Sequence, residues 1–206
     1  MNRTFVGSII AAAIGAAVAT PAAAEPPTKF SFKGETASAY FVSTSDCVET
    51  VTYVEAGNGL TRSGPGQKEA SSWVNASVYQ YDFCAEQYLH EIFGYDSLDA
   101  AAFVVSGGGR SATLAATVEA YDYATGSTVT LDLDLSWNAP GTAFMGHSSY
   151  YDRGPSYSYR SKFVGRFRDA TAAGTVSDET TNYTPEPSEG ASIGTSTYGE
   201  MFITRH

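Results

Sequence analysis

A regular alternation of apolar and polar side chains marks the segment from Thr128 to Trp137. The apolar positions are Val129, Leu131, Leu133, Leu135 and Trp137, and threonine, aspartate or serine occupies each position between them. Successive side chains of a β-strand point to opposite faces, so the pattern predicts a strand with one buried and one solvated face.

Short strand-like segments separated by turn-forming residues occupy most of the remaining chain. Further strands are predicted near 37–43, 48–55, 101–106, 157–168, 172–177 and 191–203. Glycine, proline and asparagine clusters at 57–59, 64–66, 107–109 and 138–141 supply turns between them. About ten short strands with hairpin connections predict an all-β, single-domain antiparallel β-sandwich, with a closed or partly closed β-barrel as the alternative.

An internal repeat decides between two structures for residues 84–93. Their apolar side chains could form one face of a helix, but Ala76–Phe83 aligns with Ala116–Tyr123 at an offset of forty residues. The second copy precedes the alternating segment that begins at Thr128. We therefore prefer a hairpin turn at 84–86, followed by a returning strand over 87–95.

The N-terminal residues 1–24 have the pattern of a secretory signal peptide. Asn2 and Arg3 precede an apolar run from Phe5 to Thr20, and Ala22 and Ala24 mark a small-residue cleavage site. The run is too short and too weakly apolar for a membrane span, and no second run of that length follows. The sequence predicts a secreted or periplasmic protein that is cleaved near Ala24 and forms one domain over residues 25–206.

Charge and cysteine content limit the possible partners. The 22 acidic and 12 basic residues give a formal net charge of −10, which argues against nucleic acid as a partner because the field repels phosphate. The two cysteines, Cys47 and Cys84, predict one disulfide in an oxidising compartment. We expect no metal ion and no cofactor.

Three groups of residues resemble catalytic motifs, and none of them is complete enough to assign catalysis. Residues 190–194 match G-x-S-x-G, but the helix and the following chain that a nucleophile elbow needs are missing. The pair His90 and Glu91 lacks the second histidine of a zinc protease motif. On a strand, Asp82, Glu86 and His90 would share a face, which could serve acid–base chemistry but more simply keeps the surface solvated. No catalytic residue is assigned.

A stripe of cations is predicted on one face of the strand near 157–168. Alternation separates these cations from a set of aromatic rings at Tyr157, Tyr159, Phe163 and Phe167. The stripe consists of Arg160, Lys162, Arg166 and Arg168. It is a candidate anion-binding surface, but we favour the alternative that Asp132 and Asp134 on a neighbouring strand pair with it.

The region from Asn138 to Ser156 is predicted to be a long loop and is the best candidate for a ligand site. Loops of this length in compact domains are usually functional or mobile, and either remains open here. The candidate ligand-binding residues in and beside it are His147, Tyr150, Tyr151, Arg153 and Tyr157. A second polar segment, 178–190, is predicted to be a semi-rigid connector without chemistry.

These observations favour a secreted, non-catalytic binding or surface-associated module whose ligand is an extracellular glycan or a protein surface. One alternative is a small secreted polysaccharide hydrolase using a carboxylate pair such as Asp82 and Glu86. Another is a structural component of an extracellular matrix or surface layer. The ligand and the oligomeric state are left open by the sequence.

Overall fold

The computed structural model describes residues 28–204, so the predicted signal peptide and its cleavage site lie outside the described residues. Within this range no helix has the length and apolar character needed to cross a membrane. Ten strands are present: β1 Thr28–Ser45, β2 Val48–Ser63, β3 Glu69–Asp82, β4 Gln87–Ser97, β5 Phe103–Ser106, β6 Ser111–Asp122, β7 Ser127–Asn138, β8 Ala143–Arg153, β9 Tyr157–Ser177 and β10 Gly190–Thr204.

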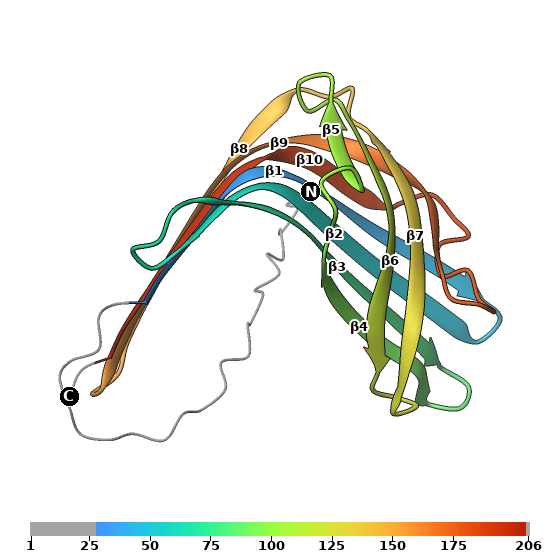
Figure 1. Ribbon diagram of the computed structural model, residues 1–206. Helices are drawn as coiled ribbons and strands as arrows, with labels where there is room; N and C mark the ends of the chain where they lie inside the picture. The colour runs from blue at the N-terminus through green and yellow to red at the C-terminus, as the bar shows by residue number, and fades with distance from the viewer. Residues whose placement is uncertain (1–27, 205–206) are drawn as a thin grey trace.

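All ten strands belong to one antiparallel sheet whose pairing returns to its starting strand. The order is β10-β1-β2-β3-β4-β6-β7-β9, and β9 pairs again with β10. Strand β8 pairs with β9, and the short β5 pairs with β6. The sheet bends into an arch, and β4, β6 and β7 lie together in one of its two limbs (Figure 1). The predicted all-β antiparallel fold is confirmed, and this ring of pairings is consistent with a sandwich or a partly closed barrel.

The inner face of the ring is apolar because adjacent strands place their buried positions opposite one another. Leu131 of β7 lies opposite Val118 of β6, and Leu135 lies opposite Leu114, with all four side chains buried. The polar positions between them, such as Asp132, point outward and are exposed. Burying one such aliphatic side chain contributes about 1.5 to 3 kcal/mol. The alternation predicted for this segment is therefore the pattern that builds the core.

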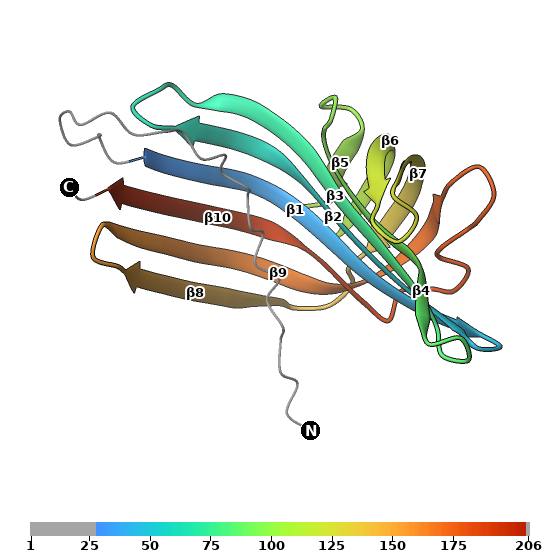
Figure 2. The same ribbon diagram turned by 90° about the horizontal axis from the view of Figure 1, so that it is seen from below.

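Long strands carry the sheet beyond the ring. The first part of β9, Tyr157–Ala170, pairs with β10, whereas its last part, Thr171–Ser177, pairs with β7. Strand β8 lies on the other side of the first part of β9. Figure 2 shows β8 and the first part of β9 side by side with the end of β10, the start of β1 and the end of β2. We call this extension the wing; it consists of residues 28–36, 57–63, 143–153, 157–168 and 194–204.

The hairpin predicted from the internal repeat is present. Strands β3 and β4 form one hairpin, and β6 and β7 form the other. The strand before each turn ends in an aspartate, Asp82 or Asp122, whose Oδ1 accepts a hydrogen bond from the N–H two residues further on, at 2.8 and 3.0 Å. The last turn residue has a positive φ in both, 53° at Glu86 and 71° at Gly126. The same four-residue turn is thus used twice.

The predicted disulfide between Cys47 and Cys84 is also present. It joins the turn between β1 and β2 to the turn between β3 and β4, across a sequence separation of 37 residues. The N–H of Phe83 donates a hydrogen bond of 2.9 Å to the carbonyl of Cys47, which reinforces the link. A disulfide is compatible with a location outside the cytoplasm, where thiols are oxidised.

The prediction of a long loop over 138–156 is wrong, because Ala143–Arg153 forms β8. The sequence of β8 contains Gly146 and several serines, so it lacks the apolar alternation that predicts a strand. The rings of Phe163 and Phe167 on β9 lie over Gly146, within 4 Å of where a β-carbon would stand. The glycine therefore makes room for aromatic packing within the sheet.

The segment between β9 and β10, predicted to be a connector, contributes to the core. Tyr183 is only 1% exposed, and its carbonyl accepts a 3.0 Å hydrogen bond from Thr52 Oγ1. Its hydroxyl donates to Asp178 Oδ2 at 2.6 Å. Burial and this bond raise the pKa of Tyr183. Burial opposes ionisation of Asp178, but the hydrogen bonds that its carboxylate accepts lower its pKa to about 2.

Candidate anion-binding surface

The β8–β9 hairpin divides the predicted ligand-binding residues between two faces. Directly paired residues in an antiparallel sheet lie on the same face. Tyr151 pairs with Arg160, so it shares the face of the cation stripe, and His147 and Arg153 do so by alternation along β8. Tyr150 pairs with Ser161 on the opposite face. Three of the five candidates, His147, Tyr151 and Arg153, therefore lie on the same side of the wing as the cation stripe, although the sequence analysis considered the two groups as separate sites.

Three further cations, which the sequence reasoning missed, extend this surface across β1 and β2. Lys29 lies opposite Met201, which lies opposite Arg160. By the same alternation Lys33 shares the face of Lys29. Arg62 lies opposite Ser31, two residues from Lys29 on the same face of β1. The sequence could have placed Lys29 and Lys33 on one face of a strand, because they alternate with Phe30 and Phe32.

We call this surface the basic face of the wing. Eight of the twelve basic residues in the sequence belong to it: Lys29, Lys33, Arg62, Arg153, Arg160, Lys162, Arg166 and Arg168. Among the residues that the structure describes, one carboxylate, Glu35, shares the face, close to the ring. Neighbouring strands lie about 4.8 Å apart, so five strands from β2 to β8 span about 19 Å. A protein with a strongly negative total charge thus concentrates its positive charge in one place.

The expected pairing of the stripe with Asp132 and Asp134 is wrong. These aspartates lie on β7 opposite Ser177 and Thr175, in the ring and away from the wing. Asp132 accepts a hydrogen bond of 2.9 Å from Thr117. Between residues 28 and 204 the only contact of a basic side chain with a carboxylate at ion-pair distance is that of His90 with Asp122, so no cation of the basic face is neutralised by a carboxylate there. The physical reason is that β9 changes partner from β8 to β7 at about residue 170.

The cations of the basic face differ in their freedom. Arg168 is half-buried, and its Nη1 donates a 2.7 Å hydrogen bond to the carbonyl of Gly141, which fixes the connection between β7 and β8. Arg62 donates to the carbonyl of Gly66 at 2.9 Å but remains exposed. The side chains of Arg160, Lys162 and Arg166 are exposed. The central part of the face therefore presents unpaired charges to solvent.

The opposite face of the wing is aromatic, and its rings interact with one another. Tyr157 stacks on Phe202 with ring centroids 5.9 Å apart, and its hydroxyl donates to Asp152 at 2.7 Å. This hydrogen bond raises the pKa of Tyr157. Tyr150 lies 6.1 Å from Tyr159. Tyr150 and Tyr157 are thus part of the packing of this face and are separated from the basic face by the sheet.

The carboxylates considered for catalysis have structural positions. Asp82 Oδ1 accepts hydrogen bonds from the N–H groups of the turn that follows it. Glu86 lies in that turn with a positive φ. His90 contacts neither of them; its Nδ1 lies 2.8 Å from Asp122 Oδ2. Asp122, the counterpart of Asp82 in the repeat, was the missed partner, and the alignment of the two copies could have identified it.

One cluster among the described residues has the residue types of a metal site. It consists of Cys47, Asp82 and Cys84. Both sulfur atoms are joined in the disulfide, and thiolate is the form of cysteine that binds metal. The two cysteines of this cluster therefore link two turns covalently and offer no thiolate to a metal ion.

Comparison with known proteins adds no assignment to these observations. No family model, no curated protein and no solved structure matches the chain. The function must therefore be inferred from the chemistry of the basic face itself.

Proposed function

We propose that the protein is an exported, non-catalytic binding module that holds an acidic polysaccharide on the basic face of the wing. The observation that carries the proposal is the collection of eight cations on one open sheet surface of a chain whose net charge is −10. Keeping like charges together without carboxylate partners costs free energy through repulsion. A bound polyanion would remove that cost.

The residue types on this face suit a glycan with carboxylate groups. Guanidinium groups such as those of Arg160 and Arg166 present planar donors that match a carboxylate in bidentate geometry. Tyr151 and His147 lie among them and offer ring faces and hydrogen-bonding groups for sugar rings. A surface about 19 Å wide can hold several charges of a polymer at once, so weak single contacts add up.

The proposal predicts binding that depends on charge and on this face. The exported protein should bind immobilised polygalacturonate but not neutral dextran at about 0.05 M salt, and binding should weaken strongly at about 0.5 M because salt screens exposed charges. Equal binding to dextran, or binding unaffected by salt, would contradict the proposal.

Two variants that each remove one positive charge test whether the polysaccharide binds at the basic face. Arg160→Gln removes a charge at the centre of the basic face and should raise the dissociation constant about fivefold, the equivalent of one charged contact of about 1 kcal/mol. Arg110→Gln removes the same charge from the exposed turn between β5 and β6 and should change the constant by less than about twofold. Equal losses in both variants would show that only total charge matters and would reject the proposed site.

A further inference from the structure

A second candidate site lies on the outer surface of the ring, at the end that carries the disulfide. Four aromatic side chains line a shallow hollow of about 340 Å³, together with Val51 and Glu49. The rings are those of Tyr79, Tyr81, Phe83 and Tyr88. Phe83 and Tyr88 are 54% and 55% exposed, so both rings are accessible to a ligand. A group of exposed rings around a hollow can bind a ligand whose chemistry suits aromatic faces.

The strand register explains how the rings come together. Tyr81 lies opposite Glu49 on β2 and opposite Tyr88 on β4, so these three side chains share the outer face. The ring centroids of Tyr81 and Tyr88 are 5.0 Å apart, and those of Tyr81 and Phe83 are 5.2 Å apart, both at steep interplanar angles. The rings of Tyr81, Phe83 and Tyr88 therefore pack edge to face beside the hollow that they line.

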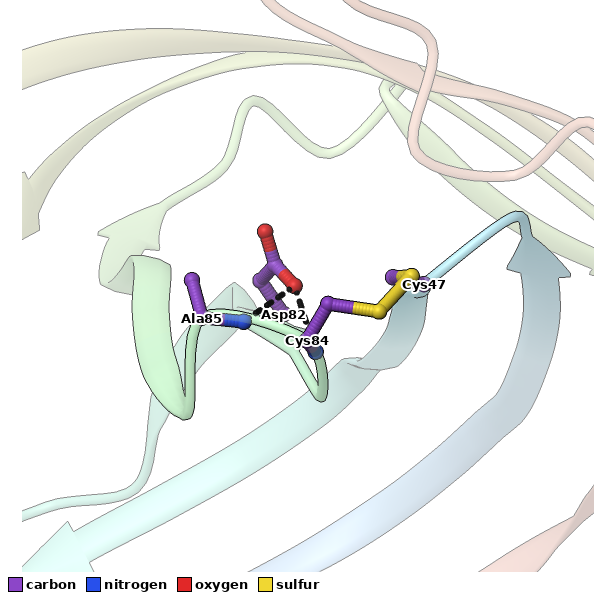
Figure 3. The surroundings of a disulfide bond; sticks show 4 residues. All are labelled: Cys47, Asp82, Cys84 and Ala85. Carbon is purple, nitrogen blue, oxygen red and sulfur yellow. Dashed lines mark hydrogen bonds between the residues drawn. A yellow bond between two sulfur atoms is a disulfide. The ribbon is translucent and has the colours of Figure 1, made fainter.

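Both turns beside the hollow are held in place. The disulfide joins Cys84, next to Phe83, to Cys47, two residues before Glu49 (Figure 3). In the same view, Asp82 accepts hydrogen bonds from the N–H groups of Cys84 and Ala85, at 2.8 and 2.9 Å. The wall that carries Phe83 is thus fixed before any ligand arrives, which lowers the entropic cost of binding.

The charge around the hollow is negative. The carboxylate of Glu49 makes no hydrogen bond or ion pair within residues 28–204, and Glu91 lies opposite Tyr79 on the same face. Strands β3 and β4 contain no lysine or arginine. Aromatic faces carry negative electrostatic potential and attract cations, most strongly where water is partly excluded. Rings and carboxylates here favour the same kind of ligand.

We propose that this hollow binds an organic ammonium cation, most simply a trimethylammonium group such as that of choline. The methyl groups would contact the rings of Tyr81, Phe83 and Tyr88, and the charge would face Glu49. The site is on the ring and is independent of the basic face on the wing, so either proposal can fail without the other.

Choline chloride is the probe, and its neutral carbon isostere, 3,3-dimethyl-1-butanol, is the matched control for shape. Titration of the exported protein at constant ionic strength, followed by the NMR signals of the tyrosine rings, should show saturable shifts for Tyr79, Tyr81 and Tyr88 with choline. The neutral isostere should bind at least about threefold more weakly, because it lacks the cation–π attraction. Equal binding of the two compounds, or no saturable shift with choline, would overturn the proposal.

The internal repeat provides a matched control for the variants. Tyr123 occupies the position of Phe83 in the second turn, is 64% exposed, and its ring lies 5.0 Å from that of Tyr121. Phe83→Ala should weaken choline binding at least about fivefold, whereas Tyr123→Ala should leave it within about twofold. Glu49→Gln keeps the size of the side chain and should weaken binding at least about threefold even if Phe83→Ala disturbs the turn. Unchanged affinity in Glu49→Gln, or equal losses in both ring variants, would show that no ammonium site exists here.

Discussion

Asp122 is a fully buried carboxylate at the pairing of β4 with β6, and its replacement tests the packing of the ring. Its side chain has 0% exposure. It accepts hydrogen bonds from the backbone N–H of Glu91 at 2.9 Å and of Ala124 at 3.0 Å, from Thr125 Oγ1 at 2.9 Å, and it meets His90 Nδ1 at 2.8 Å. The contacts with Glu91 and His90 connect β4 to β6, which share only three residue pairs, and the bonds from Ala124 and Thr125 hold the turn that follows β6. Asp122→Ala would remove all of them at the narrowest pairing of the ring.

The expected loss in the free energy of unfolding comes from the hydrogen-bond donors that lose Asp122 as their acceptor. Asp122→Ala should lower the free energy of unfolding by about 3 kcal/mol or more, because several donors lose a buried acceptor and each unsatisfied buried group costs about 1 to 3 kcal/mol. The matching change in the other turn, Asp82→Ala, removes two backbone hydrogen bonds at an exposed turn, where water can replace the acceptor. We expect that variant to cost about 1 kcal/mol. The two substitutions delete the same chemical group from the same kind of turn.

Urea unfolding at neutral pH, followed by the fluorescence of the buried Trp137, measures both costs. Burial alone would raise the pKa of Asp122, but the hydrogen bonds that it accepts from Glu91, His90, Thr125 and Ala124 lower it. A carboxylate with a lowered pKa stabilises the fold above about pH 4 and loses this contribution as the pH falls through its folded pKa. The difference in the free energy of unfolding between wild type and Asp122→Ala should therefore shrink as the pH falls below about 4. An Asp122→Ala variant no less stable than Asp82→Ala would refute this account.

Three other outcomes are expected. Reduction of the disulfide between Cys47 and Cys84 should lower the free energy of unfolding by about 4 kcal/mol, the loop-closure value for 37 residues, as measured by urea unfolding with and without reductant. Tyr183→Ala should cost about 3 to 5 kcal/mol in the same assay, because it empties a large buried site; a loss below about 1 kcal/mol would show that the segment between β9 and β10 is not part of the core. Tyr151→Ala should weaken polygalacturonate binding by about 1 kcal/mol, whereas Tyr150→Ala, on the other face, should leave binding unchanged. Biolayer interferometry with immobilised polygalacturonate measures the affinity of both variants.

Local patterns in the sequence were sufficient to predict much of the fold. The alternation over Thr128–Trp137 identified β7 and its buried face, and the repeat identified the hairpin of β3 and β4. The two cysteines were correctly paired. Each of these predictions depends on residues that are close in sequence or unique in type. Such patterns can be recognised in the sequence without knowing which distant strands pair with one another.

The wing could not be predicted in the same way, because it depends on which strands become neighbours. Alternation correctly separated Arg160 and Lys162 from the rings of β9, but it could not show that Lys29 and Arg62 extend the same face. Nor could it show that β9 exchanges β8 for β7 at about residue 170, which moves Asp132 away from the stripe. The strand β8 was missed because Gly146 and the serines around it give no apolar period.

The most direct test of the proposed function is to observe the arginine side chains while the polyanion binds. The Nε–Hε signals of the arginines can be followed by NMR during titration with an oligogalacturonate at low salt. The account predicts saturable shifts for Arg153, Arg160 and Arg166 on the basic face and no shift for Arg110 in the turn between β5 and β6. Shifts of equal size at Arg110, or no shifts on the basic face at concentrations where binding is complete, would contradict it.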